Sequence, residues 1–112
     1  MVDFFCIFID MDVWKNFIEE LNLISKLEEI YFRIRLVLQK EGWSDKDLER
    51  PPYYPQELMS LYHKFHNERD LLLKTIKEYG FDVDSNDLIN YIQIKLKKID
   101  NITPLRKPDG DY

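Results

Sequence analysis

The stretch LMSLYHKFHNERDLLLKTIKEYG, residues 58–80, decides the fold class of this chain. Large side chains and one arginine recur in it at alternating spacings of four and three, which places them along one side of an α-helix. Pro55 suits the first position of that helix, and Gly80 suits the left-handed position that ends it. The stretch therefore predicts a helix at about residues 55–79. The recurring residues are Leu58, Tyr62, Phe65, Arg69, Leu72, Ile76 and Tyr79.

The same spacing upstream predicts a long helix at about residues 12–41. Asp10 or Asp12 can cap its first turn, and Gly42 can end it. Residues 30–38 carry further apolar side chains outside the main stripe, so this helix must be covered on several sides, by the chain itself or by a partner. The main stripe consists of Trp14, Phe17, Leu21, Ile24, Leu27, Tyr31, Ile34 and Leu38.

A third helix is predicted at about residues 86–99, again from apolar residues at helical spacing. Between the helices predicted at 12–41 and 55–79, a short helical turn near residues 44–49 can begin at Ser44. The prolines of PPYYP, residues 51–55, favour an extended connector, because each proline keeps its predecessor out of the helical region. The stripe of the third helix consists of Leu88, Ile92, Lys95 or Leu96, and Ile99.

We therefore expect an all-α fold, a small bundle of three main helices. Only three glycines and five prolines occur in 112 residues, which is typical of a helical protein. We expect one domain, residues 1–100, and a mobile C-terminal tail, residues 101–112. The apolar residues 4–9 have no convincing strand partner, so we expect an apolar N-terminal arm or an extra helical turn there.

Composition argues against several classes of protein. The net charge of −5 argues against nucleic-acid binding, since such affinity comes from neutralising phosphates with lysine and arginine. Cys6 is the single cysteine, so no disulfide can form within the chain. The N-terminal apolar run lacks a basic flank and is too short to span a membrane. We expect a cytoplasmic protein that is not an enzyme and holds no cofactor, because no nucleophile elbow or glycine-rich phosphate loop occurs.

His63, His66 and Asp70 are spaced so that their side chains can converge on one side of a helix, as metal ligands do. The Glu-x-x-His pairs of di-iron bundles and the His-Glu-x-x-His arrangement of metalloproteases are both missing. These residues also flank the apolar stripe, where polar side chains belong in any case. We therefore interpret them as a solvated flank and expect no metal.

Two short motifs have structural explanations that we favour. Residues 82–93 resemble the EF-hand calcium loop at Asp82, Asp84 and Asn86, but Asp87 replaces the required glycine and Gln93 the bidentate glutamate. We interpret these acids as helix caps. The sequence PPYY, residues 51–54, matches the Pro-Pro-x-Tyr ligand of WW domains, but its prolines already serve as a connector.

The excess apolar surface of residues 30–38 and the seven tyrosines favour a protein that binds other proteins, because tyrosine suits interfaces. We expect a small acidic protein without chemistry of its own, such as an inhibitor, a toxin-immunity protein or a phage-type factor that occupies a host protein. Its partner is another protein or a second copy of itself. The alternative is a nucleic-acid-linked regulator that uses the late basic residues Lys95, Lys97, Lys98, Arg106 and Lys107. The candidate partner-binding residues are Tyr31, Phe32, Arg35, Tyr53, Tyr54 and Tyr62.

Overall fold

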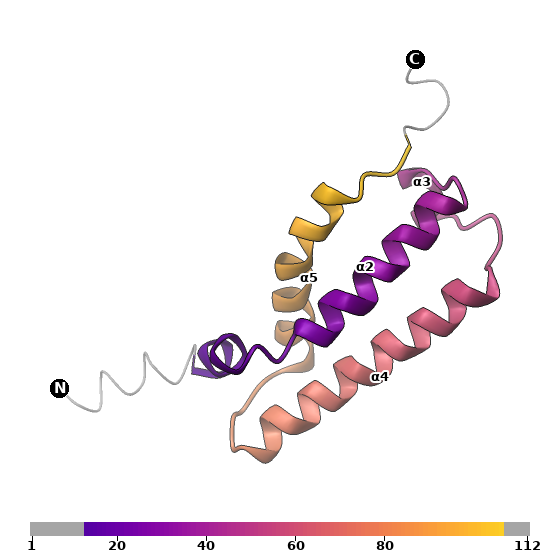
Figure 1. The fold of residues 1–112 in the computed structure, drawn as a ribbon. Helices are drawn as coiled ribbons and strands as arrows, with labels where there is room; N and C mark the ends of the chain where they lie inside the picture. Colours follow the sequence, from indigo (N-terminus) through magenta and orange to yellow (C-terminus); the bar gives the residue numbers. More distant parts are fainter. Residues whose placement is uncertain (1–12, 107–112) are drawn as a thin grey trace.

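The computed structural model describes residues 13–106, and it confirms the all-α fold class (Figure 1). Residues 13–21 are helical, and no strand occurs in the described range. The apolar residues 4–9, with Cys6, and the expected caps Asp10 and Asp12 lie outside it. The remaining helices are α2 (Ser25–Lys40), α3 (Asp45–Glu49), α4 (Gln56–Glu78) and α5 (Ser85–Ile102).

The helices α3, α4 and α5 lie where the sequence predicts them, with ends that differ by at most three residues. The short helix α3 begins after Ser44, whose backbone N–H donates to Asp47 Oδ2 at 2.7 Å. Asp84 caps α5, since its Oδ2 accepts from the backbone N–H of Asn86 at 3.1 Å. This hydrogen bond gives Asp84 the capping role that we inferred in place of calcium binding.

The first helix differs from its prediction, because it is not continuous from residue 12 to 41. Helix 13–21 ends at Asn22, whose φ of 52° lies in the left-handed region. The N–H of Leu23 donates to the Ile18 carbonyl at 3.0 Å, and the N–H of Asn22 to the Glu19 carbonyl at 3.2 Å. This pair of bonds is a Schellman motif, which closes a helix and turns the chain. Asparagine tolerates the required conformation, so the break needs no glycine.

The expected ends at Gly42 and Gly80 use the same motif. Gly42 has a φ of 75° and Gly80 a φ of 94°. At the end of α2, the N–H of Trp43 donates to the Leu38 carbonyl at 3.0 Å. At the end of α4, the N–H of Phe81 donates to the Ile76 carbonyl at 3.3 Å. Three helices of the described chain thus end alike.

Helix α2 is central, because it packs against both α4 and α5 (Figure 1). The core consists of two clusters. The first joins helix 13–21, the start of α2, the second half of α4 and α5, and it includes Trp14, Ile18 and Ile76. The second joins the rest of α2 to Trp43 and the first half of α4. Phe65 packs against both clusters and so connects them.

Residues 101–106, which we expected in a mobile tail, pack against the bundle. Helix α5 continues to Ile102, and Thr103 is buried. Arg35 of α2 donates through Nη2 to the Thr103 carbonyl at 2.7 Å and through Nε to Thr103 Oγ1 at 3.1 Å. Arg106 pairs with Ser44 in an isolated parallel bridge and donates to the Gly42 carbonyl. The rest of the expected tail, residues 107–112, lies outside the described range.

The apolar excess of α2 is covered largely by the chain itself. Ile30, Ile34, Val37 and Leu38 are buried in the second cluster. Of the other apolar residues in this stretch, only Phe32, Leu36 and the half-buried Tyr31 keep contact with solvent. The part of the chain that the structure describes includes no helix long and apolar enough to cross a membrane.

Candidate functional site

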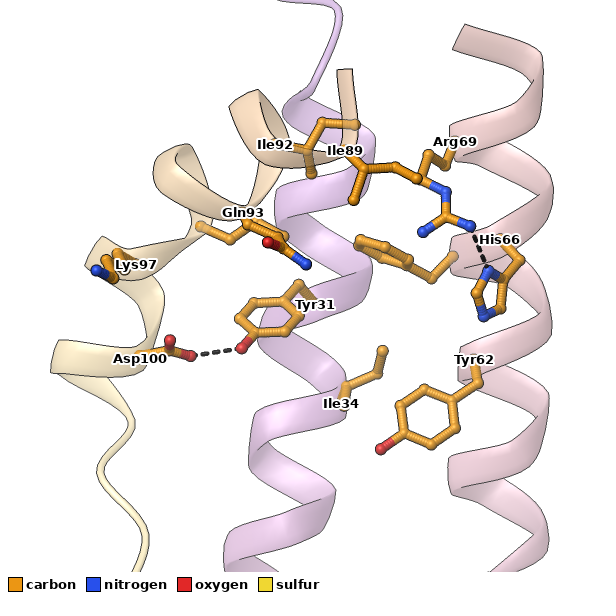
Figure 2. Close-up of a pocket in the computed structure, with 12 residues that line it drawn as sticks. Tyr31, Ile34, Tyr62, His66, Arg69, Ile89, Ile92, Gln93, Lys97 and Asp100 are labelled. Atoms are coloured by element: carbon orange, nitrogen blue, oxygen red, sulfur yellow. Dashed lines mark hydrogen bonds between the residues drawn. The ribbon is translucent and has the colours of Figure 1, made fainter. Parts of the chain in front are cut away.

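A groove lies between α4 and α5, with α2 as its floor (Figure 2). Its cavity has a volume of about 460 Å³ and opens to solvent. We call it the α4–α5 groove. Most of its surface is apolar, and the apolar side chains come from all three helices: Ile34, Phe65, Ile89, Ile92 and Leu96.

The groove follows from the helical spacing of the residues that line it. Tyr62, His66 and Arg69 lie on consecutive turns of α4, while Ile89 and Gln93 lie on consecutive turns of α5. Both sets lie beside the buried stripe of their helix. Because α2 packs against both helices, it holds these flanks on opposite sides of its own Tyr31 and Ile34. Figure 2 shows the Tyr62 ring and the Gln93 amide directed into the groove.

Tyr31 and Asp100 close the end of the groove nearest the C-terminus of α5. The Tyr31 hydroxyl donates to Asp100 Oδ1 at 2.5 Å. Burial raises the pKa of Tyr31 well above its usual value, and the hydrogen bond and the charge of Asp100 raise it further. The same oxygen of Asp100 lies 3.5 Å from Arg35 Nε. This carboxylate is therefore held by two groups of the fold itself.

His66 and Arg69 line the α4 side of the groove. Arg69 Nη2 lies 2.9 Å from His66 Nδ1, and since a guanidinium can only donate, Nδ1 accepts. Lys97 lies on the α5 side (Figure 2). Neither Arg69 nor Lys97 forms an ion pair with a carboxylate of residues 13–106.

The structure brings together two of the six predicted contact residues, Tyr31 and Tyr62, in this groove. Burial, with a smaller contribution from nearby Tyr54, raises the pKa of Tyr62. Tyr54 and Tyr53 are exposed on the connector, where the Tyr53 ring packs edge-on against Trp43 with 5.9 Å between centroids.

The other two predicted contact residues lie on α2. Phe32 is 37% exposed and lies outside the groove lining. Arg35 is only 5% exposed, because its guanidinium holds Thr103. Arg35 therefore serves the fold in this structure and does not lie at the surface. Contact with a partner through the six predicted residues stays a prediction.

The late basic residues do not form one surface. Lys95 Nζ lies 2.7 Å from Glu19 Oε1, and Lys98 Nζ lies 2.6 Å from Glu28 Oε2. The bond to Lys95, its charge and the Tyr91 hydroxyl lower the pKa of Glu19. Lys97 instead lines the groove. Lys107 lies outside the described residues.

The two histidines are not arranged as ligands. His66 lines the groove with its Nδ1 occupied by Arg69, whereas His63 is exposed and does not line it. Among residues 13–106, no group of three or more His, Cys, Asp or Glu side chains is placed to hold a metal ion.

Sequence reasoning missed most of the groove. On its α5 side, Ile89, Gln93 and Asp100 were not among the predicted contact residues, although they lie at helical spacing beside the apolar stripe of α5. That spacing was available from the sequence. It could not show that the facing flank of α4 would lie opposite, because this depends on how both helices pack on α2.

No protein-family model, curated protein or solved structure is significantly similar to this chain. The fold and the groove are thus the observations on which a function can be argued.

Proposed function

We propose that this chain is a small acidic protein that acts by binding another protein and has no enzymatic activity of its own. An inhibitor, a toxin-immunity protein and a phage-type factor that occupies a host protein all belong to this class. The observation that carries the proposal is the α4–α5 groove, an open concave surface whose lining is mostly apolar and includes the half-buried rings of Tyr31, Tyr62 and Phe65.

The chemistry of the groove supports binding more than catalysis. Its carboxylate, Asp100, is held by Tyr31 and Arg35, and its imidazole accepts from Arg69. No serine or cysteine is among the residues that line it. Aromatic residues with a hydroxyl, here Tyr31 and Tyr62, are favoured where a binding surface has an apolar centre and a wet rim. The proposal places the protein in the cytoplasm, where Cys6 would stay reduced.

The alternative, a nucleic-acid-linked regulator, has less support. Two lysines of its expected basic cluster, Lys95 and Lys98, are engaged with carboxylates. Such a regulator should bind DNA or RNA with an affinity that falls steeply with salt. Filter binding at 50 and 200 mM salt would reveal this behaviour.

Affinity purification from the native host tests the proposed function. The full chain, tagged at either end, should retain one protein in near-stoichiometric amount after a high-salt wash, because an apolar interface is weakened little by salt. Size-exclusion chromatography with light scattering should show the pair, or a homodimer if the partner is a second copy. A chain that emerges alone and monomeric would contradict the proposal.

A further inference from the structure

The length of the α4–α5 groove matches a short helix. A helix rises about 1.5 Å per residue, so the α5 side from Ile89 to Asp100 measures about 16 Å, and the α4 side from Tyr62 to Arg69 about 10 Å. Two to three turns of a further helix cover that distance. Such a helix would meet an apolar floor supplied by Ile34 of α2 and by side chains on both flanks.

The charges that the groove leaves open are positive, although the chain as a whole carries −5. Asp100 already accepts from Tyr31 and lies beside Arg35. Arg69 forms a hydrogen bond with His66, and neither Arg69 nor Lys97 has a carboxylate partner among residues 13–106. An occupant with carboxylates would supply the missing counterions on both sides of the groove.

We propose that the α4–α5 groove docks an acidic amphipathic helix of a partner protein, with apolar side chains at i, i+4 and i+7 on the groove floor and carboxylates beside Arg69 and Lys97. This inference rests on the proposed function and adds the chemistry of the partner. Helices bind to grooves in this way when one apolar face is covered and the polar face stays in solvent. The docked helix would lie against α2, α4 and α5 together.

A displayed library of 14-residue helical segments, randomised at charged and apolar positions, tests the inference with the full chain as bait. The enriched segments should be net negative and carry apolar residues at spacings of three and four. Their binding should fall at least tenfold in R69E. It should change less than twofold in K64E, which makes the same charge change on α4 but outside the groove lining.

A second pair of variants tests the groove without relying on Arg69. Ile89 lines the groove, whereas Ile94, also on α5, is 68% exposed and lies outside it. Ile89→Glu should abolish binding of the enriched segments, and Ile94→Glu should leave it intact. Both variants are compared with the starting chain by circular dichroism. Arg69 is already in contact with solvent, so we expect R69E to stay folded. This variant therefore still tests the groove if Ile89→Glu unfolds.

Several outcomes overturn the inference. These are enrichment of basic or unpatterned segments, no enrichment, or equal losses in K64E and R69E. A homodimer that R69E dissociates would make a second copy the occupant, and binding that appears only after residues 1–12 are deleted would make that segment the occupant. A native partner that both R69E and Ile89→Glu still retain would leave the proposed function standing while this inference fails.

Discussion

Arg35 shows how a single side chain fixes the end of the fold. A charged group is costly to bury unless hydrogen bonds and an opposite charge compensate. Arg35 is 5% exposed and has such partners, two hydrogen bonds to Thr103 and the carboxylate of Asp100 at 3.5 Å. Because Thr103 is 68 residues further along the chain, these bonds join α2 to the end of α5.

We predict that Arg35→Met lowers the free energy of unfolding by about 2–3 kcal/mol, because it leaves the buried Thr103 carbonyl without a donor. Methionine preserves most of the packing volume, so the loss reports the polar contacts. Urea unfolding followed by circular dichroism measures it. The control is Arg33→Met, which removes an exposed ion pair to Glu29 and should cost no more than about 0.5 kcal/mol. Equal effects of the two substitutions would contradict this role of Arg35.

Stability should also fall in alkali because of two tyrosines. Burial and the neighbouring Glu19 raise the pKa of Tyr91 to about 12, and burial with the Asp100 bond raises the pKa of Tyr31. A raised folded-state pKa gives stability that is complete below the unfolded pKa of about 10 and is lost as the pH rises through the folded value. We predict a decline from about pH 10 upward in urea midpoints.

The variant Tyr31→Phe/Tyr91→Phe removes both hydroxyls and should decline less between pH 9 and 11. Below pH 9 it should be less stable than the starting chain, because it lacks the hydrogen bonds to Asp100 and Glu19. Parallel curves for the two proteins across that pH range would show that other groups cause the decline.

The residues at the helix ends show which helix boundaries could be predicted from the sequence. Gly42 and Gly80 mark two ends in advance, because glycine is the usual residue at the left-handed position of a Schellman motif. Asn22 occupies the same position at the first end, but asparagine also occurs in many other contexts. The apolar spacing continues through the break, since Leu23 packs on the first cluster next to the buried Ile18 and Ile24. A continuous stripe therefore predicted one helix where there are two.

We predict opposite effects of two substitutions at Asn22. Asn22→Gly should leave stability unchanged or raise it slightly, since glycine adopts a φ of 52° at no steric cost. Asn22→Ala should lower the free energy of unfolding by about 1 kcal/mol, as should Gly80→Ala, whose added Cβ meets nothing within 4 Å and so costs only backbone strain. Thermal denaturation of the three variants provides the comparison. A more stable Asn22→Ala would show that residue 22 is not left-handed in solution.

At the scale of the whole molecule, two core clusters share α2, α4 and the side chain of Phe65. Each cluster contains one of the two tryptophans of the chain, Trp14 in the first and Trp43 in the second. Because α2 and α4 extend without interruption through both clusters, neither can lose its packing alone.

We predict that the chain unfolds in one transition. Fluorescence of Trp14→Phe reports the second cluster, and fluorescence of Trp43→Phe the first, so each variant should give the same urea midpoint as its own circular dichroism. Phe65→Ala should lower the midpoint reported from both clusters. Phe32→Ala, on the exposed side of α2, should change it much less. Midpoints that differ between fluorescence and circular dichroism in either variant would show that the clusters unfold separately.

The groove marks the limit of what the sequence could predict. Periodicity indicated the helices, and Tyr31 and Tyr62 were candidate contacts because tyrosine suits interfaces. Arg35 was also a candidate contact, because the spacing of residues along α2 cannot show that Thr103, 68 residues away, binds its guanidinium. The arrangement of Arg69 opposite Lys97 likewise arises only when α4 and α5 pack on α2. Local spacing carries no information on such pairings.

The segment 103–106 makes completion of the fold depend on the last part of translation. Arg35 leaves the ribosome 68 residues before Thr103, which corresponds to roughly 3–14 s at about 5–20 residues per second. Throughout that interval Thr103 has not been synthesised, so the Arg35 guanidinium lacks its final hydrogen-bond acceptors. The turn at Gly42 likewise lacks the hydrogen bond from Arg106. The polypeptide thus reaches its final packing only after synthesis has passed residue 106.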